Sequence, residues 1–177
     1  MEQEQHYQHE RFQITSLADT ANTESLARDV YDGLTGSPRS ISPKYFYDER
    51  GSWLFDQICQ TDEYYLTRAE AQLLRQHGEE IISTARPDAL VEFGSGTADK
   101  TELLIQASNK LNDSFHYLPV DVCREILLDS GKRLTERYHW LSVDAWHGDF
   151  LDHMQGIENH HERSLYSFLG SSLGNFS

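Results

Sequence analysis

The chain has 177 residues, of which 38% are hydrophobic and 25% are charged, and its formal net charge is −14. This length is typical of one folded domain, and the composition is that of a soluble globular protein. The acidic excess, without clustered lysine or arginine, argues against nucleic acid and anionic membrane surfaces as partners.

The sequence shows no sign of export or of a membrane anchor. No apolar run approaches the roughly 20 residues that a membrane span requires. The N-terminus, which begins Met1-Glu-Gln-Glu, is too polar for a secretory signal peptide. The two cysteines, Cys59 and Cys123, form neither a metal-binding spacing nor a disulfide framework. We therefore expect a cytoplasmic protein with reduced cysteines.

The first half of the chain predicts helices rather than strands. Residues 1–22 are expected to form a polar N-terminal tail, of which residues 1–11 are disordered or loosely attached. Residues 23–86 form an expected helical segment that is rich in aromatic side chains. One of its helices starts near Thr67, where Glu70 three residues later is typical of a capping box.

The second half, residues 87–177, predicts strands that alternate with helices, the pattern of a parallel sheet built from βαβ units. An open doubly wound sheet usually continues beyond a fourth strand, so we expect the chain to be a fragment that is incomplete at its C-terminus. The expected strands span residues 89–93, 115–121, 140–146 and 165–170, and the expected helices between them span 98–109 and 122–137.

A predicted strand, a glycine turn and a helix N-terminus meet in the segment Val-Glu-Phe-Gly-Ser-Gly-Thr-Ala-Asp-Lys at residues 91–100. Gly94 and Gly96 allow backbone N–H groups to approach a ligand that a Cβ would keep away. A dinucleotide fingerprint has a third glycine where this chain has Asp99, whose carboxylate would repel a pyrophosphate. By itself the turn does not separate a ligand site from an ordinary strand–helix connection. If it binds a ligand, a nucleoside without phosphates is favoured, and S-adenosylmethionine (SAM) is the leading candidate.

Further polar residues follow the later strands, where ligands of open α/β sheets bind. Asp121 lies where a carboxylate would accept hydrogen bonds from both ribose hydroxyls. Asp149 is placed to accept from an adenine N–H, with Phe150 against the ring. An aspartate at a strand end is more often a helix cap than a ribose ligand. Taken together at successive strand ends, however, these residues favour a ligand site.

Six sequence blocks in this order resemble the SAM-dependent L-histidine Nα-methyltransferases of ergothioneine biosynthesis. The resemblance covers roughly residues 30–177 and is more specific for the family than for the substrate, since related fungal enzymes methylate other amino-acid amines. The blocks are Ser42-Pro-Lys-Tyr-Phe-Tyr-Asp-Glu-Arg-Gly-Ser-Trp-Leu-Phe-Asp, Glu63-Tyr-Tyr-Leu-Thr-Arg-Ala-Glu, Glu92-Phe-Gly-Ser-Gly-Thr-Ala-Asp-Lys-Thr, Pro119-Val-Asp-Val, Gly148-Asp-Phe and Phe168-Leu-Gly-Ser-Ser-Leu-Gly-Asn.

The resemblance implies a doubly wound, Rossmann-like class I SAM methyltransferase sheet, truncated after the fourth strand, and a role for individual residues. For the tyrosines, core packing is the competing interpretation from the residues alone. The implied cofactor-binding residues are Gly94, Ser95, Gly96, Lys100, Asp121, Asp149 and Phe150; the implied substrate-binding residues are Tyr47, Tyr64, Gly170 and Asn175, of which Asn175 and Tyr47 are the implied catalytic pair.

The implied activity is the methylation of the α-amino group of L-histidine to its trimethylated form, hercynine, the first step of ergothioneine biosynthesis. SAM would supply the methyl group, and no metal is expected. Family members are nearly twice as long and carry further substrate-binding residues, so we expect this chain alone to be inactive. It is expected to be a monomer or to join a complementary C-terminal segment. The alternatives are a non-catalytic or split SAM-binding module, and an N-methyltransferase of another amino-acid amine.

Two other patterns suggest chemistry and are not favoured. His153, His160 and His161 fall in a polar, acidic segment whose spacing fits no compact zinc motif, so a solvated loop is favoured over a metal site. Gly170-Ser-Ser-Leu-Gly matches the nucleophile-elbow pattern of hydrolases, but no later histidine exists to complete a triad.

Overall fold

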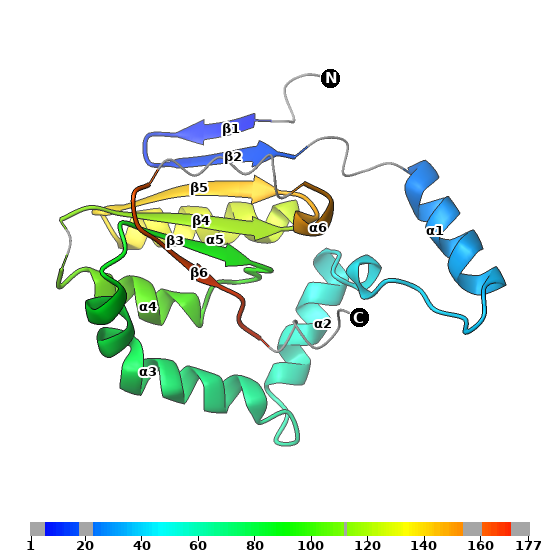
Figure 1. The fold of residues 1–177 in the computed structure, drawn as a ribbon, viewed down its shortest axis with the longest axis horizontal. Helices are drawn as coiled ribbons and strands as arrows, with labels where there is room; N and C mark the ends of the chain where they lie inside the picture. The colour runs from blue at the N-terminus through cyan, green and yellow to red at the C-terminus, as the bar shows by residue number, and fades with distance from the viewer. Residues whose placement is uncertain (1–5, 18–22, 112, 154–160, 171–177) are drawn as a thin grey trace.

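The computed structural model describes residues 6–17, 23–111, 113–153 and 161–170. Its centre is a six-stranded sheet with the strand order β1-β2-β5-β4-β3-β6 (Figure 1). β1 is antiparallel to β2, and all other neighbouring strands are parallel. The strands are β1 (His6–His9), β2 (Phe12–Ser16), β3 (Ala89–Phe93), β4 (Phe115–Asp121), β5 (Leu141–His147) and β6 (Ser164–Ser167).

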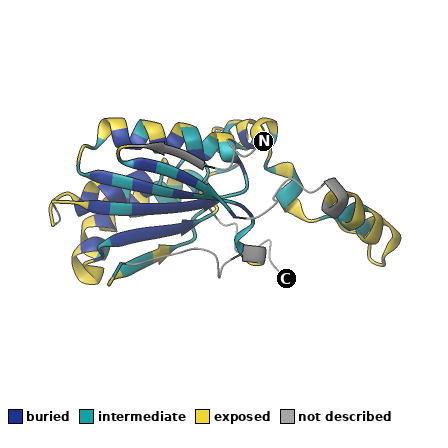
Figure 2. Cartoon of the chain, turned by 90° about the horizontal axis from the view of Figure 1, so that it is seen from above, coloured by how far each residue is buried: buried dark blue, intermediate teal, exposed yellow. Residues whose placement is uncertain are grey.

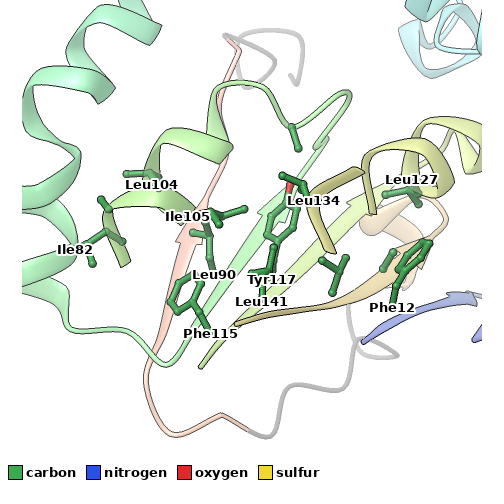
Figure 3. Close-up of a cluster of buried hydrophobic side chains, with 14 of the residues drawn as sticks. Phe12, Ile82, Leu90, Leu104, Ile105, Phe115, Tyr117, Leu127, Leu134 and Leu141 are labelled. Atoms are coloured by element: carbon green, nitrogen blue, oxygen red, sulfur yellow. The ribbon is translucent and has the colours of Figure 1, made fainter. Parts of the chain in front are cut away.

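One face of the sheet carries the main hydrophobic core. Inward-facing side chains of β2 to β5 pack there against apolar residues of α3, α4 and α5 (Figure 3). Ala89, Val91 and Leu118 form a second, smaller cluster, in which strand residues alternate with those of the main core. The helices are α1 (Thr23–Thr35), the 3₁₀ turn η2 (Pro43–Phe46), α2 (Glu49–Cys59), α3 (Leu66–Ala85), α4 (Thr101–Ser108), α5 (Arg124–Arg137) and α6 (Phe150–His153).

The predicted α/β fold with a parallel sheet is confirmed. The four predicted strands correspond to β3, β4, β5 and β6, and the two helices predicted between them correspond to α4 and α5. Short apolar strands separated by helices are a strong pattern, because each crossover between parallel strands needs a helix-sized connection.

The prediction of a polar tail at residues 1–22 is wrong where the chain forms the strands β1 and β2. Phe12 and Ile14 are fully buried in the main core, and β2 pairs with β5 in parallel register. The Arg11 guanidinium donates to the backbone carbonyls of Thr135, Tyr138 and Leu141 at 2.7–2.9 Å. The apolar alternation in β2 covers only a few residues and its partner strand is distant in sequence, so the local pattern did not reveal the strand.

The predicted capping box at Thr67 is also wrong. α3 begins at Leu66, and its N-cap residue Tyr65 makes no side-chain cap hydrogen bond. The Thr67 hydroxyl instead points to the Cys59 sulfur, at 3.4 Å. Glu70 makes contacts across the fold, which are described with the site below. Tertiary hydrogen bonds have taken the place of the local pair.

The helical N-terminal segment is far less buried than the sheet. α1 lies away from the sheet at one end of the molecule, and most of its surface is exposed (Figures 1 and 2). Large apolar side chains of α2 and α3 are exposed as well, among them Trp53, Ile58 and Leu73. Among the described residues, no helix combines the length and the apolar character that a membrane span requires.

The packing of β2 on α5 predicts opposite effects for two glycine-to-alanine variants. A Cβ on Gly131 would lie 2.4–2.9 Å from three ring carbons of buried Phe12, whereas a Cβ on Gly78 of α3 would meet its neighbours at 3.7 Å or more. Gly131→Ala should therefore lower the free energy of unfolding by about 1–3 kcal/mol through overpacking. Gly78→Ala should be neutral or stabilise by up to about 1 kcal/mol through helix propensity.

Urea denaturation followed by circular dichroism measures both changes. If Gly131→Ala and Gly78→Ala have the same stability, Phe12 does not pack on α5 in solution. Adding Phe12→Leu to the Gly131→Ala variant should restore part of the lost stability, because it removes the ring atoms that collide with the new methyl group.

Candidate functional site

The carboxyl ends of β3, β4 and β5 border one cavity with a volume of about 520 Å³. This is within the usual size range of small-molecule and cofactor sites. The cavity is lined by all seven predicted cofactor-binding residues, Gly94, Ser95, Gly96, Lys100, Asp121, Asp149 and Phe150, and by two of the predicted substrate-binding residues, Tyr47 and Gly170. Asn175 lies outside the described residues.

The glycine turn after β3 needs its glycines. Gly94 has φ +68° and Gly96 has φ +51°, values that residues with a Cβ rarely adopt. The Gly94 N–H donates to the Val120 carbonyl at 2.9 Å, which holds the turn against β4. A Cβ on Gly96 would meet no atom within 4 Å, so the turn faces open space on the cavity side. This leaves the backbone accessible to a ligand.

Asp121 holds the turn from the end of β4. Its Oδ2 accepts from the Gly96 N–H at 2.8 Å, and its Oδ1 accepts from the Cys123 N–H at 2.9 Å. Burial raises the pKa of this carboxyl, while the N–H groups of Cys123 and Gly96 act in the opposite direction. Each carboxylate oxygen has two lone pairs, so both can accept a further bond from a ligand hydroxyl.

Glu92 lies beneath the turn and is almost completely buried. Its carboxylate accepts from the Thr101 hydroxyl of α4 and from the Tyr117 hydroxyl of β4, both at 2.5 Å. Burial raises the pKa of Glu92 to about 7, an effect that the two hydroxyl bonds and Lys100 partly offset. The side chain thus joins β3, β4 and α4 at the wall of the cavity, which it also lines.

Asp149 and Phe150 lie on the side of the cavity formed by the end of β5. Asp149 accepts from Lys44 at 3.1 Å and from the Leu151 N–H at 3.0 Å. The Phe150 ring packs between Phe93 and Phe168, with centroid distances of 5.2 and 5.5 Å. Lys44 was not predicted as a site residue, although it falls within the first of the sequence blocks.

Glu70 is a second residue at the site that was not predicted from the sequence. Its carboxylate accepts from Lys100 at 2.5 Å and from the Gly170 N–H at 3.1 Å. It therefore links α3 to the helix that follows the glycine turn and to the segment after β6. Only the tertiary fold brings these three parts together, so no local sequence signal could have identified the contact.

The two predicted substrate tyrosines differ in position. Tyr47 lines the cavity and packs edge-on against Phe55, with the ring centroids 6.2 Å apart. Tyr64 packs on the same Phe55 ring at 5.8 Å and is not among the residues that line the described cavity. Burial raises the pKa of the Tyr64 hydroxyl. Both tyrosines thus belong to one aromatic cluster, of which Tyr47 is the member at the cavity wall.

The cavity lining is more acidic than basic. Five carboxylates line it, against two lysines, and both lysines are already paired with acidic side chains. This lining suits a ligand that carries hydroxyls and positive charge, and it disfavours phosphates. Asp99, whose carboxylate was predicted from the sequence to repel a pyrophosphate, lies in the same lining.

The burial of Glu92 predicts a pH-dependent stability. Its pKa in the folded protein is about 7, against an ordinary value of 4.5. Between these values the folded state holds a proton that the unfolded state has released, so the free energy of unfolding falls as the pH rises. Glu92→Gln should remove this contribution, which is on the order of 3 kcal/mol over the whole window.

The measurement is the unfolding free energy at several pH values between 4.5 and 8 for wild type and variant. Glu136→Gln, on the exposed surface of α5, is the matched control and should follow the wild-type curve. A Glu92→Gln curve with the wild-type slope would show that Glu92 is ionised throughout this range.

Comparison with known proteins identifies the family of the chain. The family of SAM-dependent, histidine-specific methyltransferases matches residues 26–177. Histidine N-alpha-methyltransferases are 42% identical in Mycobacterium tuberculosis and 45% in Mycolicibacterium smegmatis; each match covers 91% of this chain and 50% of the relative. Ergothioneine biosynthesis protein 1 of Neurospora crassa is 32% identical over 79% of this chain and 16% of that protein. The chain thus spans about half the length of the two bacterial relatives, and it belongs to the family of SAM-dependent, histidine-specific methyltransferases.

Proposed function

We propose that the chain binds SAM in the cavity described above and contributes this site to an enzyme that methylates the α-amino group of L-histidine. The observation that carries the proposal is the meeting of the glycine turn, Asp121, Asp149 and Phe150 in one cavity at three neighbouring strand ends. The names of the two bacterial relatives support histidine as the acceptor. The product would be trimethylated histidine, hercynine, and the pathway that of ergothioneine, as the name of the fungal relative suggests.

The described residues fit SAM in their chemistry. Asp121 would accept the ribose hydroxyls, and Asp149 would accept an adenine N–H in exchange for its bond to Lys44. Phe150 would contact the adenine ring. The open space beside Gly96, where a Cβ would meet no atom within 4 Å, would allow close approach of the nucleoside to the turn formed by Gly94, Ser95 and Gly96. Lys100, at the start of α4, would pair with the carboxylate group of the ligand in place of Glu70.

The chain's own residues would align and desolvate the acceptor amine. SAM supplies a methyl group that its sulfonium already activates, so alignment matters more than acid–base strength. Tyr47 at the cavity wall and Asn175 would accept hydrogen bonds from the amine. Such neutral acceptors stabilise the ammonium form less than a carboxylate does, which leaves more of the amine unprotonated. Gly170 and Tyr64 would complete the substrate side.

A split or non-catalytic SAM-binding module is the second candidate. Methylation of a different amino-acid amine is the third. In each case we propose a cytoplasmic, monomeric protein, or one that pairs with a complementary segment. For the two enzymes we propose a transfer step that needs no metal.

Calorimetric titration with SAM tests the cofactor site in the chain as it stands. Wild type should bind one SAM molecule, and Asp121→Ala should weaken binding by more than about tenfold, because it removes the ribose acceptor and releases the Gly96 turn. Glu79→Gln, an exposed variant on α3, is the control and should bind like wild type. A folded wild-type chain that fails to bind SAM would contradict both the enzyme and the module.

Mass spectrometry of methylated products tests the acceptor. We expect no transfer to L-histidine by the chain alone, and transfer after addition of the remaining half of the Mycolicibacterium smegmatis relative. In that mixture Asn175→Ala should lower the rate at least about tenfold with unchanged SAM affinity, while exposed Asn109→Ala should not. Transfer to another amine but not to histidine would support the third candidate, and absence of transfer in a mixture that binds SAM would support the module.

A further inference from the structure

Two histidines and an aspartate meet away from the cavity described above. His116 of β4, Asp144 of β5 and His161, three residues before β6, each offer a ligand atom, and these atoms lie within 4.8 Å of one another. None of the three lines the cofactor cavity. The cluster is therefore separate from the proposed methyl-transfer site.

The sheet register explains why His116 and Asp144 share a face. In the register of the two strands, His116 of β4 is opposite Ser142 of β5. Asp144 follows Ser142 by two residues, so it is a diagonal neighbour of His116. Side chains two residues apart on a strand point to the same face. Phe115 and Tyr117 belong to the main core, so His116 and Asp144 face away from that core.

His161 reaches this face because its segment is anchored nearby. The Asp88 N–H donates to the Arg163 carbonyl at 2.7 Å, and the Arg163 N–H donates to the Asp88 carboxylate at 3.2 Å. The Asp88 carbonyl in turn accepts from the His116 N–H at 3.3 Å. Asp88 thus holds both the start of β4 and the segment that carries His161, and this brings the two imidazoles together.

The imidazole rings of His116 and His161 pack against each other. Their ring centroids are 4.2 Å apart with a 35° tilt. The His116 Nδ1 atom is buried, and none of the described residues gives it a hydrogen-bond partner. A buried imidazole nitrogen without a partner is costly. All three side chains are only half-buried, so an ion and its water ligand could reach them.

We propose that His116, Asp144 and His161 bind one Zn²⁺ ion. Two imidazoles and a carboxylate are a common zinc donor set, and ligand distances near 2.0–2.2 Å place donor atoms roughly 3.3 Å apart. The three donor atoms, which lie within 4.8 Å of one another, would move closer together when the ion binds. A water molecule would take the fourth position. The ion would fasten the segment before β6 to β4 and β5. Among the described strands β6 pairs only with β3, so this cross-link stabilises the edge of the sheet that leads to Gly170.

Titration with ZnCl₂ against a chromophoric chelator tests the proposal. The wild-type chain should bind one Zn²⁺ per molecule, and Asp144→Asn and His161→Ala should each weaken binding by at least about tenfold. His77→Ala is the matched control. His77 contacts the Glu80 carboxylate at 3.1 Å on the exposed surface of α3, and the described residues offer this His–carboxylate pair no third ligand. This control should retain wild-type affinity.

A thermal-shift measurement provides a second readout. Zn²⁺ should raise the melting temperature of wild type and of His77→Ala, because it binds the folded state, and should not raise that of Asp144→Asn. Asp144→Asn keeps the size of the side chain, and circular dichroism verifies that it folds. Absence of a one-to-one site in wild type, or a tight site that survives the double change His116→Ala and His161→Ala, would overturn the proposal. SAM binding by the same samples is measured separately. Because the three zinc ligands do not line the cavity, failure of the zinc proposal leaves the proposed SAM site untouched, and the reverse also holds.

Discussion

The geometry of the cavity depends on the hydrogen bonds of the Glu92 carboxylate, which is buried near the end of β3. It accepts hydrogen bonds from a hydroxyl of α4, the helix that follows the glycine turn, and from a hydroxyl of β4, the strand beside the turn. A buried carboxyl group is tolerated only where hydrogen bonds or protonation compensate for lost hydration. Its two hydroxyl partners are themselves buried, so the three side chains hold one another in place below the turn.

A second carboxylate, Asp121, completes this support from the side. Because β3 and β4 are parallel and adjacent, their ends meet at one edge of the sheet, and Asp121 reaches the Gly96 N–H across that edge. The turn is therefore fixed at both of its ends before any ligand arrives. Such preorganisation lowers the entropic cost of binding. The cavity lining, which has more carboxylates than lysines, favours a cationic nucleoside over a phosphorylated one.

The predictable parts of this protein are those whose signals are local. Gly94 and Gly96 identify a turn because their backbone conformations exclude most other residues, and the apolar strand before them identifies β3. The placement of Asp121 and Asp149 at the same cavity follows from the parallel order of the strands. Lys44 and Glu70 escaped prediction because their partners, Asp149 and Lys100, are distant in sequence. The β1–β2 hairpin escaped for the same reason, since β2 is stabilised by β5 rather than by its own short pattern.

The sequence by itself determined the α/β class, the parallel strands, the glycine turn and the set of polar residues that follow the strands. These features depend on backbone conformation and on apolar periodicity, which neighbouring residues encode. The tertiary structure alone decided that Phe12 packs on Gly131, that Glu70 joins Gly170 to Lys100, and that His161 lies beside His116 and Asp144. Those contacts depend on strand order and register, which arise from burial of the whole core and cannot be read from the spacing of residues along the chain.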